Sequence, residues 1–109
     1  MVRQGDIIFL DFDPQAGSEQ AGVRPALVVS TNKYHFVTSK RAIVCPITRS
    51  DRKLPIHIRL DGRTETKGFI MCDQIKTVDL VARGFEFVEK APSDIVDRVL
   101  DVLAEFIGI

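Results

Sequence analysis

The chain of 109 residues has only two cysteines and two histidines, and none of them shows the spacing of a metal or redox site. Cys45 and Cys72 form no CxxC pair, and neither His35 nor His57 has further ligands at metal-site intervals. We therefore expect two buried, reduced thiols, and two histidines at the surface or rim of a site rather than catalysts. No GxGxxG, GxxxxGKS/T or GxSxG motif is present, so the sequence predicts neither a nucleotide cofactor nor a serine-hydrolase elbow.

Long apolar runs are also missing. None approaches the length of a membrane helix, and the apolar run 7–10 is too short for a signal peptide and is followed by Asp11. We expect a cytoplasmic protein with no membrane partner. The length suits a single domain over residues 1–109 with one hydrophobic core.

The net charge is zero, which argues against a generally basic nucleic-acid-binding protein. The charges are unevenly distributed, because residues 33–67 hold nine basic groups against three acids, while the segments on either side are acidic. This basic middle favours a local positive face suited to a polyanion. An ordinary solvated face remains an equal alternative on charge alone.

Short apolar runs predict a small, mainly β domain. The predicted strands cover residues 6–12, 25–30, 42–48, 56–60, 68–72 and 84–88. Pro46 has no amide hydrogen to donate, so we expect an edge or a bulge there. Residues 34–39 read as a mixed loop with room for a helical turn. Several short strands close together indicate a small barrel.

The last segment changes to helical periodicity, with apolar residues every three or four positions from Ile95 to Ile107. Pro92 or Ser93 suits the start of this helix and Gly108 its end. We expect the helix to cover an open barrel end or a sheet face rather than to bind a partner.

Polar side chains gather where the predicted strands end. If the strands form one barrel, these ends can meet at one rim. Arg24 offers planar donors for phosphate, Thr48 offers a hydroxyl, and Glu19 and Asp73 are proton acceptors. This inventory fits metal-free phosphodiester cleavage better than acyl transfer or redox chemistry, although a rim of turns and caps would look similar. The residues are Glu19, Gln20, Arg24, Thr48, Arg49, Ser50, Asp73 and Gln74.

Four blocks of sequence carry a family resemblance. The run DFDPQAGSEQAGVRPALVVS at 11–30 resembles the opening block of the MazF/PemK family of toxin endoribonucleases, the mRNA interferases of type II toxin–antitoxin systems. The blocks VCPIT at 44–48, GFIMCDQIKT at 68–77 and ARG at 82–84 are similar in the same order and spacing. Together they span nearly the whole chain.

The resemblance implies a fold, an activity and partners. The fold would be an SH3-like, CcdB/PemK-type small antiparallel barrel with a C-terminal helix, assembled as a homodimer. The activity would be cleavage of single-stranded RNA at a short sequence, without metal or cofactor. The partner would be a small antitoxin whose disordered tail blocks the site.

The same resemblance assigns roles to residues. Arg24 and Thr48 match the active-site positions, with Glu19 in the same loop as a third catalytic candidate. Some PemK-type members have His where this chain has Ser18 and Arg where it has Met71, and use them with the aspartate that matches Asp73. Ser18 and Met71 cannot donate protons in that way, so the resemblance favours the mechanism that uses Arg24 and Thr48. The candidates for RNA contact are Ser18, Gln20, Arg49, Ser50, Lys53, Asp73 and Gln74, and those for base stacking are Tyr34, Phe36 and Phe69.

The expected reaction is attack of a ribose 2′-hydroxyl on the adjacent phosphorus, which gives a 2′,3′-cyclic phosphate and a 5′-hydroxyl. Arg24 and Thr48 suit stabilisation of the phosphorane charge. A guanidinium holds its proton too tightly to be a good base, so Glu19 is the more natural acceptor, or else an ion-pair partner that orients Arg24. Two alternatives stay open: a CcdB-like toxin that binds DNA gyrase and cleaves nothing, and an inactive binding module.

Overall fold

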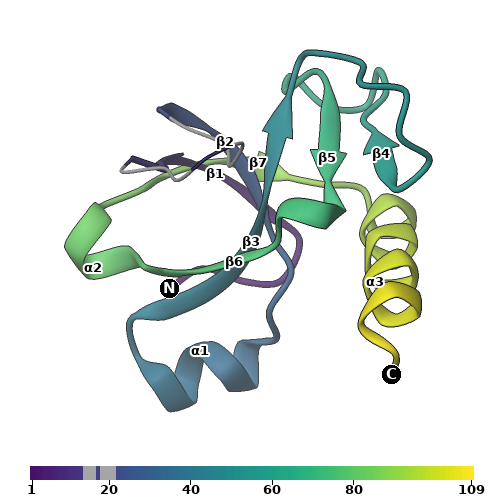
Figure 1. Cartoon of the computed structure of the whole chain (residues 1–109). Coiled ribbons are helices and arrows are strands. Elements are labelled where there is room, and N and C mark those ends of the chain that lie inside the picture. The colour runs from purple at the N-terminus through teal and green to yellow at the C-terminus, as the bar shows by residue number, and fades with distance from the viewer. Residues whose placement is uncertain (14–16, 18–21) are drawn as a thin grey trace.

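The computed structural model of the protein describes residues 1–13, 17 and 22–109, and it consists of a curved antiparallel sheet with helices around it (Figure 1). The elements, in chain order, are β1 (Asp6–Asp11), β2 (Val23–Val28), α1 (Asn32–Thr38), β3 (Arg41–Thr48), β4 (His57–Arg59), β5 (Phe69–Met71), the 3₁₀ turn η1 (Cys72–Gln74), β6 (Lys76–Asp79), α2 (Leu80–Arg83), β7 (Glu86–Lys90) and α3 (Ser93–Ile107).

β3 lies at the centre of the sheet, whose order is β4-β5-β3-β2-β1-β7. Residues 41–44 of β3 pair with β6, whereas Ile47 and Thr48 pair with β5. Pro46 falls between these two ladders, where β3 changes partner and a missing amide donor costs least. Within the described residues no ladder joins β4 to β7, so the sheet is antiparallel as predicted but is not closed into a barrel.

The sheet carries a hydrophobic cluster on each face, because side chains alternate along every strand. Ile7, Leu27 and Ile47 belong to the cluster beneath α3, whereas Ile8 and Val28 belong to the other. On α3 the buried side chains are Ile95, Val96, Val99 and Leu103, and the helix lies beside β4 and η1 (Figure 1). The expectation that the last helix covers a face of the sheet is confirmed.

Two helices and one strand differ from the expectations. Residues 32–38 form a full helix, α1, because the hydroxyl of Thr31 accepts the amide hydrogen of Tyr34 at 3.2 Å and so caps the first turn. The sequence shows no clear apolar period over β6 and α2, so neither element is among those predicted. The carboxylate of Asp79 starts α2 by accepting the amides of Val81 and Ala82, both at 3.0 Å.

The expectation that both histidines lie at the surface or a rim is wrong. His35 is 2% exposed and contacts the hydroxyl of Ser30, and the side chain of His57 is 2% exposed with its Nε2 2.7 Å from Oδ1 of Asp73. Each imidazole has a polar partner at its Nε2, which offsets part of the cost of burial.

Both cysteines are buried and free, as expected. Burial raises the pKa of both thiols, that of Cys72 to about 11, because a thiolate loses its hydration inside the core. Both side chains belong to the hydrophobic cluster beneath α3.

Gly68 lets β5 approach the end of β3 more closely than any residue with a side chain could. Its φ is +124°, and a β-carbon added there would lie 2.2 Å from the carbonyl oxygen of Thr48. The backbone of Gly68 therefore helps to fix the position of Thr48.

We expect Gly68→Ala to lower the free energy of unfolding by about 1–3 kcal/mol from backbone strain alone, with steric overlap added to this. Chemical denaturation measures the loss. The matched control is Gly62→Ala, because a β-carbon at Gly62 meets nothing within 4 Å. Equal stability of the two variants would contradict the role given to Gly68.

Candidate active site

An open cleft of about 630 Å³ lies where β2 begins and β3 ends, against the segment 65–67. Among the described residues its lining has four basic side chains and one acid, so the cleft is positively charged although the protein is neutral. The basic residues are Arg24, Arg49, Arg52 and Lys67, and the acid is Glu65. A polyanion is the ligand that this balance favours.

Arg24 and Thr48 reach this cleft from neighbouring strands. The ladder between β2 and β3 reaches Ala26 and Pro46, which lie opposite each other. Two residues further along, the same register would place Arg24 across from Thr48, and both line the cleft. The strands are no longer paired at that level, and the cleft lies between them.

Thr48 is 4% exposed, and its Oγ1 accepts the amide hydrogen of Ser50 at 3.2 Å. This bond fixes the hydroxyl oxygen and leaves the hydroxyl hydrogen for donation. A half-buried guanidinium and an oriented hydroxyl on one cleft can hold the oxygens of a phosphate and stabilise added charge on them.

The opposite wall, residues 65–67, is held by Glu89 of β7. Its carboxylate accepts the amide and the hydroxyl of Thr66, each at 2.7 Å, and the amide of Glu65 at 3.1 Å. On the same loop Arg63 donates to Asp94 of α3 at 2.8 and 3.0 Å. Hydrogen bonds to β7 and α3 therefore hold the loop that forms this wall of the cleft.

The base of the first loop is anchored at both ends. Arg83 of α2 donates to the carbonyl oxygens of Asp11 and Asp13 at 2.8 and 2.7 Å. Two further bonds join the two ends of the loop. The carboxylate of Asp13 accepts the amide hydrogen of Gly22 at 3.0 Å, and the carbonyl oxygen of Gly22 accepts the amide hydrogen of Phe12 at 3.0 Å. These bonds fix where the chain leaves β1 and where it enters β2, just before Arg24.

The structure brings some of the predicted site residues together and places others elsewhere. Arg24, Thr48, Arg49 and Ser50 line the cleft. The catalytic candidate Glu19 and the RNA-contact candidates Ser18 and Gln20 lie outside the described residues.

Three other RNA-contact candidates do not belong to the described lining of the cleft. Lys53 is exposed, and its Nζ lies 3.3 Å from Oδ2 of Asp51. Asp73 forms a hydrogen bond with His57, and Gln74 is the next residue of the same 3₁₀ turn, η1. Met71 is fully buried.

Sequence reasoning missed the contribution of the loop before Gly68. Glu65 and Thr66 line the cleft. Arg52 and Lys67 line it too, and both belong to the basic segment 33–67 that the sequence indicates as a positive face for a polyanion. Nothing local marks Glu65 and Thr66, because their position depends on Glu89, which is more than twenty residues away.

Within residues 1–13, 17 and 22–109, no group of three or more His, Cys, Asp or Glu side chains is arranged to hold a metal ion. Nor does any helix in that part of the chain have the length and apolar character needed to cross a membrane.

A family model described as "PemK-like, MazF-like toxin of type II toxin-antitoxin system" matches residues 3–107. The chain belongs to the PemK/MazF toxin family. This PemK/MazF chain is 36% identical over 107 residues to endoribonuclease PemK of Escherichia coli, in an alignment that covers 94% of the chain and 80% of the relative.

Solved structures of the PemK/MazF family share the fold. MazF (Form-I) from Deinococcus radiodurans superposes with a TM-score of 0.92 at 32% identity, covering 99% of this chain and 97% of that one. A MazE–MazF structure (Form-II) from the same organism gives a TM-score of 0.85 at 32% identity, covering 99% and 96%. The small antiparallel β fold with a C-terminal helix is therefore the fold of a MazF toxin.

We expect Glu89 to make the wall of the cleft sensitive to acid. Burial by itself raises the pKa of Glu89, but the hydrogen bonds from Thr66 and Glu65 outweigh it, and the pKa lies below its ordinary value of 4.5. A carboxylate with a lowered pKa stabilises the fold above 4.5, and this contribution is lost as the pH falls through the lowered value.

Thermal unfolding followed from pH 7 down to pH 3 measures this effect. Glu89→Gln should lower the melting temperature at pH 7 and should reduce the further loss on acidification. Glu86→Gln, which changes an exposed acid of the same strand, is the control. Parallel pH curves for all three proteins would contradict the assignment.

Proposed function

We propose that this PemK/MazF chain is an endoribonuclease toxin that cleaves single-stranded mRNA at a short sequence without a metal ion. The observation that carries the proposal is the placement of Arg24 and Thr48 on one basic cleft at the ends of adjacent strands. The similarity to endoribonuclease PemK of E. coli over 94% of the chain supports the same activity.

In the proposed reaction the 2′-hydroxyl gives its proton to a base and attacks the neighbouring phosphorus. The P–O5′ bond breaks and the leaving 5′-oxygen takes up a proton from water, so the products carry a 2′,3′-cyclic phosphate and a 5′-hydroxyl. Arg24 donates two parallel hydrogen bonds to the phosphate oxygens, and the Thr48 hydroxyl donates a third. Negative charge develops on these oxygens in the transition state, so the donors stabilise the transition state more than the substrate.

Two carboxylates are candidates for the group that accepts the 2′ proton. Glu19 follows from the family resemblance, and Glu65 is the acid in the described lining of the cleft. Glu19→Gln and Glu65→Gln separate them, since only the variant of the base should lose the ascending limb of the pH–rate profile. Arg49 and Ser50 bind the RNA backbone, with Gln20 and Ser18 from the first loop.

We propose that the chain works as a homodimer inhibited by a small antitoxin whose disordered tail occupies the cleft. A MazF from D. radiodurans has been solved with MazE, which supports a partner of that kind. Light scattering should give the mass of two chains, and a monomeric mass at working concentrations would contradict the dimer.

We expect Arg24→Ala and Thr48→Ala each to lower kcat by about 10²–10³-fold, the usual effect of removing one transition-state donor. Cleavage of a long single-stranded RNA measures the loss, and melting temperatures show whether each variant is folded. Arg98→Ala, a change on the exposed side of α3, is the control and should cleave normally. Loss of folding in step with activity would make Arg24 structural.

A 2′-deoxy sugar placed 5′ to the scissile phosphate should abolish cleavage, since it removes the nucleophile. The same deoxy substitution one nucleotide away should have little effect. Mass spectrometry of the wild-type products should find the cyclic phosphate, and EDTA should leave the rate unchanged. Cutting at the deoxy site would refute the mechanism, and inhibition by EDTA would refute metal independence.

The non-nuclease alternatives have their own signatures. A CcdB-like toxin would leave RNA intact and inhibit DNA gyrase, and an inactive module would not arrest growth when expressed. The basic cleft with Arg24 and Thr48 favours the nuclease over both.

A further inference from the structure

The row of side chains that contains Thr48 continues across the sheet. Thr48 of β3 lies opposite Phe69 of β5, which in turn lies opposite Arg59 of β4. Residues directly opposite in antiparallel strands point to the same face of the sheet. Ile70, the next residue along β5, is fully buried on the other face. Thr48, Phe69 and Arg59 therefore form one row on the face opposite Ile70 and the hydrophobic cluster beneath α3.

Arg59 and Phe69 are in contact within this row. The guanidinium carbon of Arg59 lies 6.0 Å from the centre of the Phe69 ring, within the range of a cation–π interaction. Both residues line a second hollow of about 260 Å³. This hollow shares Arg49 and Lys67 with the main cleft, so the two depressions adjoin each other.

We propose that Phe69 and Arg59 form a stacking site for a nucleobase next to the scissile phosphate, an inference that rests on the proposed endoribonuclease function. Neighbouring strands are about 4.8 Å apart, so Phe69 and Arg59 lie one and two strand spacings from Thr48. The second hollow is therefore within reach of a nucleotide that adjoins the scissile phosphate.

The chemistry of the two side chains suits an unpaired base. Bases of single-stranded RNA stack on aromatic rings and on guanidinium planes, and every base has a face that can do so. Arg49 and Lys67, at the junction of the two hollows, can neutralise the phosphate that links the stacked nucleotide to the scissile one. The site therefore binds a base by stacking and its backbone by charge.

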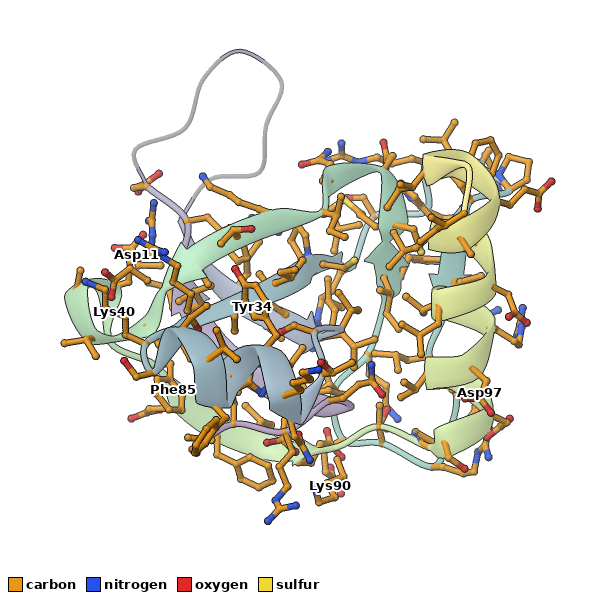
Figure 2. All side chains as sticks on the ribbon, turned by 90° about the horizontal axis from the view of Figure 1, so that it is seen from below. Asp11, Tyr34, Lys40, Phe85, Lys90 and Asp97 are labelled. Carbon is orange, nitrogen blue, oxygen red and sulfur yellow. The ribbon has the colours of Figure 1, made fainter. Side chains whose placement is uncertain are left out.

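The other aromatic candidates occupy a different part of the molecule. Tyr34 lies on α1 (Figure 2), which is next to the start of β3 and so at the other end of that strand from Thr48 (Figure 1), and Phe36 belongs to the same helix. Neither lines the cleft or the second hollow in the part of the chain that the structure describes. Of the three, Phe69 is the one in register with Thr48.

Phe69→Leu removes the aromatic face and keeps an apolar side chain, so it should raise KM about 5- to 150-fold, the range found for loss of one stacked base. Phe69→Tyr keeps the ring and should restore binding. Arg59→Lys keeps the charge and loses the planar group, so a raised KM for this variant indicates stacking rather than phosphate binding. Phe87→Leu, a change at an exposed position of β7, is the matched control.

Abasic substrates locate the stacked nucleotide. Removing the base at one position flanking the cleavage site should raise KM for the wild type, and it should raise KM no further for Phe69→Leu. An equal penalty in both proteins at every position would overturn the stacking site while leaving the endoribonuclease function intact. If the wild type cleaves no RNA at all, the proposed function itself is refuted.

A binding test separates these failures because it needs no cleavage. The sequence contains no tryptophan, so Phe69→Trp introduces the sole indole. Titration with an RNA made uncleavable by 2′-deoxy substitution should quench its fluorescence, and the abasic version of that RNA should quench it less. Phe87→Trp is the control and should not respond. No quenching, or equal quenching by both RNAs, would overturn the proposal.

Discussion

The change of partner along β3 is the constraint on which the other parts of the structure depend. One half of this strand pairs with β6, and the other half pairs with β5. β2 pairs with the middle of β3 as far as Ala26 and Pro46, and the residues of β2 before Ala26 pair with β1 instead. Because the end of β3 leaves β2 and stays with β5, a cleft lies on one side of Thr48 and a continuous row of side chains on the other. Gly68 makes this arrangement possible by admitting the backbone of β5 against Thr48.

The positive charge of the cleft arises in a neutral protein because many acids are engaged elsewhere. Asp13 and Asp79 accept backbone amides that would otherwise lack partners. Further acids bind side chains: Asp94 holds Arg63, and Asp73 holds His57. Near the cleft the basic groups are left in excess, with Glu65 as the acid among the described lining. Net charge is therefore a poor guide to the ligand of such a small protein, and the local balance is a better one.

Much of the sheet could be predicted from the sequence, because the apolar residues of β1, β2 and β3 form continuous runs. The long amphipathic α3 was equally clear from its period. The helix α1 was harder, since its formation depends on a cap by Thr31 rather than on strong helix formers. The burial of His35 and His57 could not be predicted, because their partners, Ser30 and Asp73, reach them only in the folded chain.

Some residues of the candidate site could likewise be predicted from the sequence, and others could not. Arg24 and Thr48 were found because each lies at the end of an apolar strand, a place where polar residues often act. The wall at 65–67 has no such signal, and its position follows from bonds to Glu89. The direct opposition of Phe69 to Thr48 depends on strand register, which sequence patterns alone do not fix.

The reactivity of the two buried thiols measures how often the folded domain opens. In the folded chain Cys45 and Cys72 are shielded from solvent, and their raised pKa keeps them protonated near neutral pH. The thiolate is the group that attacks an alkylating reagent, so labelling requires that the cluster beneath α3 first opens to solvent. The rate of modification is then set by how often the domain opens, and the same shielding makes the folded toxin resistant to oxidants that act on thiols.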